Sequence, residues 1–269
     1  MAKAGLCTVG YSKKVVSSVL DLAARAGADG VEIWGQPDHV RYPIDSAQLR
    51  ELREQAEALA LEVCALGSYF HAGGKVEYAK VKVDARNQLR IARELGASLI
   101  RIWAGTGTRA ESSDAARKKA IDDIRAFADH AGDARIGVVL ERHAGTLTHG
   151  WEGIPEILAD IGHQNVALNY QVVYPATEDE LEDRAVDDYT TLLPLSRHAH
   201  LQNYLPADDG SLKRAFLDSG IVDYSRLGAV SRASGYTGYF MVEFPADFND
   251  GLSDVETVRR DIDFIKRLH

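Results

Sequence analysis

Short apolar segments alternate with longer amphipathic segments along the whole chain. The short segments are rich in branched apolar residues, which is typical of buried strands. The longer segments repeat apolar residues every three or four positions, which is typical of helices that pack one face on a sheet. Eight strands are predicted in this way, at residues 6–11, 30–35, 61–70, 98–105, 136–143, 166–171, 198–204 and 239–244.

Capping residues support the helices predicted between these strands. A serine, threonine or aspartate at a helix start satisfies free N–H groups of the first turn, and a glutamate or glutamine three residues later strengthens the signal. Gly27 suits the end of the first helix, where a left-handed residue is common. The predicted starts are Ser12, Asp45 with Gln48, Thr177 with Glu180, and Ser253 with Glu256.

Eight strand–helix units in 269 residues predict a (β/α)8 TIM barrel, which we expect to form one domain over residues 1–269. A doubly wound sheet is the main alternative, and it usually carries a glycine-rich phosphate-binding turn after an early strand. The chain contains neither GxGxxG nor GxxxxGK(S/T). The pattern therefore favours the barrel.

Charge and composition narrow the classes of function. The chain has 31 basic and 40 acidic residues, a net charge of −9, which disfavours binding to nucleic acid or to an anionic membrane surface. No apolar run is long enough to span a membrane, and the first residues do not resemble a secretory signal. Two cysteines cannot form a disulfide framework, so we expect a cytoplasmic protein.

Polar residues gather at the carboxyl ends of predicted strands five to eight. Active sites of barrels lie at these ends, and residues two apart on a strand share a face. Buried carboxylates are costly unless a cation or a polar substrate offsets them, so the pattern predicts a functional site. The residues are Glu141 and His143 on strand five, Asn169 and Gln171 on strand six, His198, His200 and Gln202 on strand seven, and Glu243 on strand eight.

Earlier strands add Glu32, Arg101 and Trp103, each with two interpretations. Glu32 and Arg101 could contact the substrate, or form an ion pair across neighbouring barrel strands. Trp103 suits either packing or a pocket wall. His198 lies deeper in its strand than His200, which favours a hydrogen-bonded core position over direct contact with a substrate.

The residue types also indicate what the site holds. Carboxylate oxygens and an imidazole nitrogen suit a divalent Mn, Mg, Co or Zn ion and leave room for a chelating substrate. Two glutamates beside such an ion could act as acid and base on opposite faces of a bound sugar.

At this point the chain resembles the xylose-isomerase-like TIM barrel superfamily, which includes sugar phosphate isomerases/epimerases and ketose 3-epimerases. The resemblance covers essentially the whole chain and rests on GVEIW at strand two, LERHAGTL at strand five, HAHLQN at strand seven and VEF at strand eight. It implies that Glu141, His200 and Glu243 hold a metal ion, and that the two glutamates move protons. It also implies a homodimer or homotetramer.

Strand six departs from the family pattern. Gln171 stands where the family has a metal-binding Asp, and Tyr174 where it often has a His. An amide oxygen can ligate a hard cation but brings no charge, so a divalent metal should bind less tightly. The predicted metal ligands are Glu141, Gln171, His200 and Glu243, with Glu141 and Glu243 catalytic; the predicted substrate-binding residues are Glu32, Arg101, Trp103, His143, Asn169, Tyr174, His198 and Gln202.

The resemblance leaves several functions open. An isomerase or epimerase of a small carbohydrate is the first hypothesis, and a dehydratase of the inosose dehydratase type using the same site is the second. A metal-free sugar-binding relative is the third, because of Gln171. An endonuclease of abasic DNA, which shares the fold, is disfavoured by the net charge. The long loop from 206 to 221 contains Lys213 and Arg214, which could reach a phosphate but are expected to lie in solvent.

Overall fold

Eight parallel strands close into a barrel in the computed structural model, which describes residues 3–74, 77–78, 81–82, 84–172, 188–247 and 251–268. Around the barrel, β1 pairs with β2 on one side and with β12 on the other. This confirms the predicted (β/α)8 TIM barrel. In barrel order the strands are β1 (Lys3–Cys7), β2 (Gly30–Trp34), β3 (Glu62–Ala72), β6 (Leu99–Ala104), β7 (Gly137–Glu141), β8 (Val166–Gln171), β9 (Ser196–Leu201) and β12 (Tyr239–Val242).

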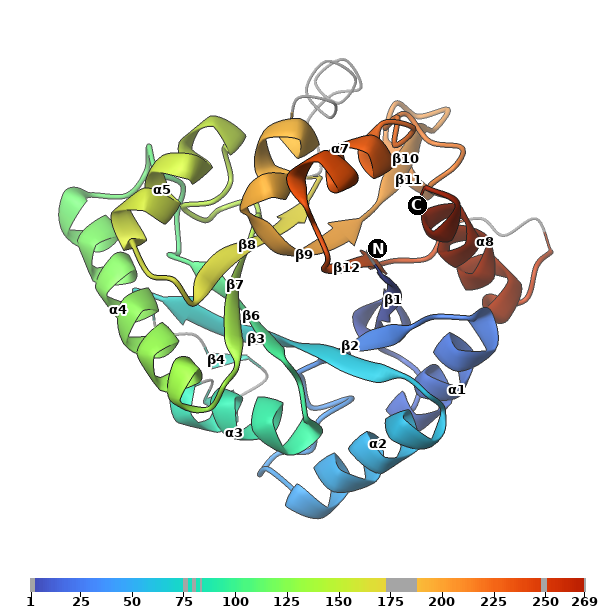
Figure 1. Cartoon of the computed structure of the whole chain (residues 1–269), viewed down its shortest axis with the longest axis horizontal. Helices are drawn as coiled ribbons and strands as arrows, with labels where there is room; N and C mark the ends of the chain where they lie inside the picture. The colour runs from blue at the N-terminus through green and yellow to red at the C-terminus, as the bar shows by residue number, and fades with distance from the viewer. Residues whose placement is uncertain are drawn as a thin grey trace.

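Helices surround the strands as an outer layer (Figure 1). Each buries an apolar stripe against the barrel, as α8 does with Val258, Ile262 and Ile265. The helices are α1 (Val16–Ala26), α2 (Ser46–Ala58), α3 (Ala85–Leu95), α4 (Asp114–Asp133), α5 (Ile154–Ile161), α7 (Leu227–Ser234) and α8 (Asp254–Arg267), with short 3-10 turns η1 (Thr8–Tyr11), η2 (Trp151–Gly153) and η3 (Leu193–Leu195).

The capping signals that the described residues contain were mostly correct. Asp45 accepts hydrogen bonds from the first turn of α2, and Ser253 with Glu256 forms a complete capping box on α8. Gly27 ends α1 in the left-handed conformation, with φ of 85°. The pair Thr177 and Glu180 lies outside the described residues.

The first predicted strand and the first predicted cap were wrong. Strand β1 begins three residues earlier and ends at Cys7, and Ser12 follows η1 while α1 begins only at Val16. The chain leaves the sheet because the Thr8 hydroxyl accepts a hydrogen bond from the backbone N–H of Trp34, at 2.8 Å. The Thr8 hydroxyl thus accepts the hydrogen bond that a backbone carbonyl of β1 would accept if the strand continued.

The seventh predicted strand, 198–204, is two elements. After β9, the chain enters β10 (Asn203–Pro206), which pairs antiparallel with β11 (Leu212–Ala215). The segment predicted as a long loop therefore contains a hairpin strand. A second small hairpin joins β4 (Glu77–Tyr78) to β5 (Val81–Lys82). Among the described residues, none of the helices has the length and apolar character to cross a bilayer.

Candidate active site

The strand register brings the predicted residues together. Glu141 is level with Asn169, and Gln171 is level with His200. Glu243 follows directly after β12, whose Met241 is level with His200. Because all these strands are parallel, the carboxyl ends of β7, β8, β9 and β12 meet at one mouth of the barrel.

All four predicted metal ligands face one point. The Nδ1 atom of His200 lies 3.6 Å from Oε1 of Glu141 and 3.6 Å from Oε1 of Glu243. The same Nδ1 atom lies 3.2 Å from Oε1 of Gln171. All four side chains are buried. Three kinds of ligand atom that suit a divalent cation therefore converge from four strands.

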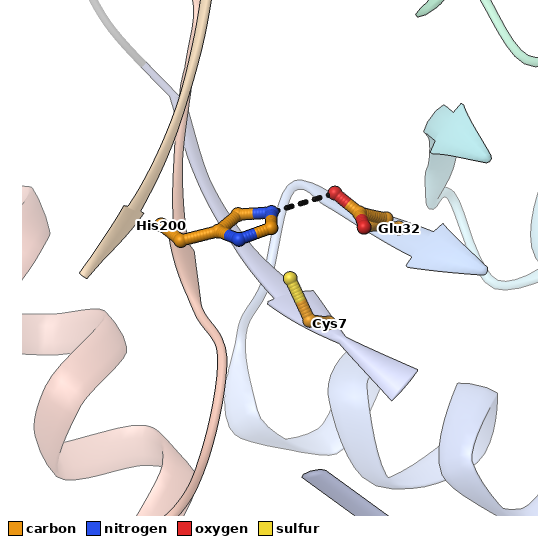
Figure 2. A group of neighbouring side chains, drawn as sticks. All are labelled: Cys7, Glu32 and His200. Carbon is orange, nitrogen blue, oxygen red and sulfur yellow. Dashed lines mark hydrogen bonds and ion pairs between the residues drawn. The ribbon is translucent and has the colours of Figure 1, made fainter. Parts of the chain in front are cut away.

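Glu32 fixes the orientation of the His200 ring. Its Oε2 lies 2.8 Å from Nε2 of His200 (Figure 2). The same oxygen lies 2.9 Å from Nε2 of His198. A carboxylate oxygen only accepts, so each histidine donates Nε2–H to it. In neutral His200, the Nδ1 lone pair then faces Glu141, Gln171 and Glu243, which is the arrangement that carboxylates impose on metal-binding histidines.

Cys7, at the end of β1, points toward the same space as Glu32 and His200 (Figure 2). Burial and the nearby Glu32 carboxylate raise the pKa of the Cys7 thiol to about 12. Without a cation the sulfur is therefore a neutral thiol at physiological pH. Because Nδ1 of His200 faces Glu141, Gln171 and Glu243, we interpret Cys7 as packing against the His200 ring and not as a member of that set.

Arg101 joins Glu32 to Glu141. Its Nε lies 3.1 Å from Oε1 of Glu32, and its Nη1 donates to Oε2 of Glu141. The predicted ion pair is therefore present, but the strands are not neighbours, because β3 lies between β2 and β6. Gly67 of β3 leaves the space: a Cβ there would lie 2.5 Å from Glu32 Oε1 and 2.8 Å from Arg101 Nη2.

The two predicted catalytic glutamates have different surroundings. Oε2 of Glu141 accepts from Arg101 and from Nε1 of Trp103. Burial disfavours its charge, but the Arg101 guanidinium and His200 together outweigh burial and lower the pKa of Glu141 to about 2. Oε2 of Glu243 accepts from the neutral amide of Gln202. Burial, with the Glu141 carboxylate adding to it, raises the pKa of Glu243 to about 7.

A cavity of about 300 Å³ opens at this end of the barrel. Four predicted substrate-binding residues, Arg101, Trp103, His143 and Gln202, line it, and the rings of Trp103 and His143 stack with centroids 4.7 Å apart. Glu32, Asn169 and His198 are not among the described residues that line it. Glu32 contacts Arg101 and His200, Asn169 contacts His200, and His198 contacts Glu32. The buried, hydrogen-bonded position favoured for His198 is what the structure has, and contact of these residues with a substrate stays a prediction. Tyr174 lies outside the described residues.

The sequence pattern missed several residues of the cavity wall. The wall also contains Tyr69, Tyr204, Phe244 and Arg214. Arg214 was expected in solvent, but the β10–β11 hairpin places it level with Tyr204. Residues 212–215, Leu-Lys-Arg-Ala, show no alternation of apolar and polar residues, so the sequence held no local signal for this position.

The charge of the site fits a divalent cation. Three buried carboxylates, Glu32, Glu141 and Glu243, face one buried guanidinium, that of Arg101. Burial lowers the pKa of His200, but the negative groups around it, Glu32 and Glu243 among them, outweigh burial and raise that pKa well above its ordinary value, so without a cation a proton on His200 offsets part of this charge. A divalent cation at Nδ1 would take the place of that proton, because a coordinating imidazole is neutral. In addition, Oδ1 of Asn169 is buried with no hydrogen-bond partner among the described residues, beside the His200 ring. The donor set and the charge together suit Mg²⁺, Mn²⁺, Co²⁺ or Zn²⁺.

The fold and the site together define a (β/α)8 barrel with a carboxylate and histidine centre at the mouth. The chain belongs to the xylose isomerase-like TIM barrel family, whose sequence profile matches residues 20–268. The family resemblance given by the sequence is thereby confirmed.

Three known proteins show what the chain is similar to. A 3-dehydroshikimate dehydratase of Bacillus anthracis is 24% identical over 214 residues, which cover 77% of this chain and 73% of that protein. The structure of an L-ribulose 3-epimerase has a TM-score of 0.73 at 18% identity, covering 100% of this chain and 94% of the other. A xylose isomerase-like TIM barrel protein from Mycobacterium smegmatis, in complex with magnesium, has a TM-score of 0.71 at 18% identity, covering 100% and 96%.

Proposed function

We propose that this protein is a divalent-metal-dependent enzyme that isomerises or epimerises a sugar or a sugar-derived substrate. The observation that carries the proposal is the convergence of Glu141, Gln171, His200 and Glu243 beneath one cavity. The family and its epimerase and dehydratase members support an enzyme of this class.

In this proposal the four side chains hold the cation through Oε1 of Glu141, Oε1 of Glu243, Oε1 of Gln171 and Nδ1 of His200. When bound, a divalent cation supplies stabilisation of the negative charge that develops on a carbonyl oxygen after a neighbouring C–H proton is lost. Glu243 removes that proton, because its second oxygen is held only by the neutral Gln202 amide. Trp103 and Tyr69 form the aromatic wall that excludes water from the reacting carbon.

Return of the proton decides the product. Epimerisation needs a donor on the opposite face, and Glu141 is the second carboxyl group at the cavity. Isomerisation needs Glu243 to return the proton to the neighbouring carbon, and the proton of the adjacent hydroxyl group to move to the former carbonyl oxygen. Both routes use the carbonyl chemistry that the site favours.

Dehydration is the second candidate. The similarity to the dehydratase of Bacillus anthracis supports it. The hydrogen bonds that Arg101 and Trp103 donate to Glu141 support it as well. A glutamate held by a guanidinium is a poor proton donor, so a reaction that needs a single base suits the site. Glu243 would then take the proton from the carbon next to the carbonyl and pass it to the hydroxyl group of the following carbon, which leaves as water while the double bond forms.

One experiment separates these outcomes. The purified protein, loaded with Mn²⁺ or treated with a chelator, is incubated with a panel of ketoses and with 3-dehydroshikimate, and the products are identified by NMR in D2O. We expect metal-dependent turnover, with deuterium at the carbon next to the carbonyl if a ketose is converted. A new double bond would assign the dehydratase. Turnover that the chelator leaves unchanged would contradict the proposal.

A further inference from the structure

We propose that Arg214 binds an anionic group of the substrate, a carboxylate or a phosphate, at the rim of the cavity. This inference rests on the proposed function, because it names the substrate class for the same cavity. Arg214 belongs to the β10–β11 hairpin, far along the chain from the residues that hold the cation, and its side chain lines the cavity together with Glu243.

Among the residues that the structure describes, the guanidinium of Arg214 is held in place by an aromatic ring and not by a charged partner. Its Cζ lies 3.8 Å from the centre of the Phe244 ring, a cation–π contact with the residue next to Glu243. The backbone of Arg214 exchanges two hydrogen bonds with Asp247, whose Oδ2 accepts from the Arg214 N–H at 2.7 Å. Within the described part of the chain, no carboxylate lies at ion-pair distance from this guanidinium.

The other arginine of the cavity, Arg101, is already paired with carboxylates of the protein. It donates to Glu32 and Glu141, so its positive charge is balanced before a substrate binds. A divalent cation in the proposed site would balance the remaining carboxylates. The positive charge of Arg214 would then be the unbalanced charge at the cavity, and an anionic group of the substrate would neutralise it. An arginine fork on an aromatic face is well suited to two parallel hydrogen bonds to a carboxylate or phosphate.

The cavity shape limits the rest of the ligand. Its volume of about 300 Å³ is at the small end of ligand pockets, and its walls carry the rings of Tyr69, Trp103 and Tyr204. Aromatic walls suit the apolar face of a six-membered or five-membered ring. The geometry therefore favours one ring that carries one anionic group.

The test measures binding rather than turnover, so it stands apart from the test of the proposed reaction. Calorimetry with Mg²⁺ present compares 3-dehydroshikimate, D-fructose 6-phosphate and neutral D-fructose. We expect one of the two anions to bind at least about tenfold more tightly than D-fructose, and the tighter one identifies carboxylate or phosphate. Arg214→Gln should lower the affinity for that anion by about 10- to 100-fold, which is the range of a charge-assisted hydrogen bond. The affinity for D-fructose should stay unchanged.

Lys213 provides the matched control, because it is the exposed neighbour on the same hairpin and carries the same charge. Lys213→Gln should leave the affinity for the anion unchanged, and Arg214→Lys should keep only part of it. The proposal is overturned if Lys213→Gln weakens binding as much as Arg214→Gln, if D-fructose binds as tightly as both anions, or if neither anion binds.

Discussion

At the scale of single residues, Glu141 and Glu243 differ in the group that holds their second oxygen. A guanidinium and an indole N–H hold Glu141, whereas one amide holds Glu243. A carboxylate beside a guanidinium gives up its charge reluctantly, so Glu243 is the better proton carrier of the two.

We predict that Glu141→Gln and Glu243→Gln both lose turnover, by on the order of 100- to 10,000-fold, with the fold unchanged. Excess Mn²⁺ should partly restore Glu141→Gln, whose main loss is a ligand, but not Glu243→Gln, which also loses the base. Steady-state kinetics over a range of Mn²⁺ concentrations, with circular dichroism as the check on folding, measure this. A change in KM alone for both variants would show that neither glutamate takes part in the chemistry.

A second prediction concerns Gln171, the neutral member of the cluster. Gln171→Asp adds a carboxylate and should tighten Mn²⁺ or Mg²⁺ binding by about tenfold or more, because these ions favour charged oxygen ligands. Titration calorimetry of both proteins measures it. Equal affinities would mean that Gln171 is not a ligand, and Asn169→Asp, which changes the buried amide beside the His200 ring, would then be the variant to titrate.

At the scale of elements, β3 acts as a spacer within the charge cluster. Gly67 is level with Arg101 on one side and with Trp34 on the other, and it leaves room for the Glu32–Arg101 pair to pass over the strand. The chain therefore needs a residue without a side chain at this position, for steric reasons.

We predict that Gly67→Ala weakens metal binding by about 10- to 100-fold, because it displaces the groups that orient His200 and Glu141. Gly132→Ala in α4 is the control, since a Cβ there meets nothing closer than 3.7 Å. Calorimetric titration with Mn²⁺ compares the two. If Gly67→Ala binds Mn²⁺ as the wild type does, the Glu32–Arg101 pair is not needed to position the ligands.

Helix α8 anchors the segment that follows the β10–β11 hairpin. Oδ1 of buried Asp261 accepts from the backbone N–H of Leu217 at 2.8 Å. Burial raises the pKa of Asp261 from its ordinary 3.8 to about 7, with the Asp218 carboxylate adding to burial and the Leu217 N–H and Arg260 opposing it. The hydroxyl of Tyr11 lies close enough to sense the Asp261 charge.

Asp261 should therefore make stability depend on pH. The folded protein holds this proton more tightly than the unfolded chain, so the contribution of Asp261 to stability is complete below about pH 4 and is lost as the pH rises toward 7. We predict that the Tm of Asp261→Asn, which keeps an acceptor for Leu217, rises relative to the Tm of the wild type between pH 4 and pH 8. The difference should grow by about 2–4 °C for each kcal/mol of stability that the wild type loses. The control is Asp263→Asn, an exposed position on the same helix. A difference that is constant with pH would contradict the prediction.

At the scale of the whole molecule, the barrel brings together ligands from β7, β8, β9 and from the residue after β12. A cation bound to them would join strands that are far apart in the chain, and it would bind the folded state only. Assembly as a homodimer or homotetramer, and organisation as one domain, stay predictions.

We predict that Mn²⁺ at 100 times its dissociation constant stabilises the protein by about 2.7 kcal/mol, which raises Tm by several degrees. Differential scanning fluorimetry with Mn²⁺, with chelator, and with sodium chloride at equal ionic strength measures it. Glu141→Gln should show a smaller rise. An equal Tm with Mn²⁺ and with chelator would contradict a metal site in the folded protein.

The sequence by itself determined the barrel, the order of its strands and the face on which polar residues gather. Strand and helix periods are local properties, and parallel strands in a closed barrel have their carboxyl ends at one mouth. Glu141, Gln171, His200 and Glu243 could be predicted as a group for this reason, and the structure brings them together.

Only the tertiary structure decided what surrounds that group. The end of β1 at Cys7 depends on a hydrogen bond between Thr8 and Trp34, which are distant in the chain. The space at Gly67 matters because β3 lies between the strands of Glu32 and Arg101, and the two side chains meet over it. The turn of the hairpin moves Arg214 from an apparent surface loop to the cavity wall. Each of these depends on the packing of distant segments, which no local pattern of apolar and polar residues records.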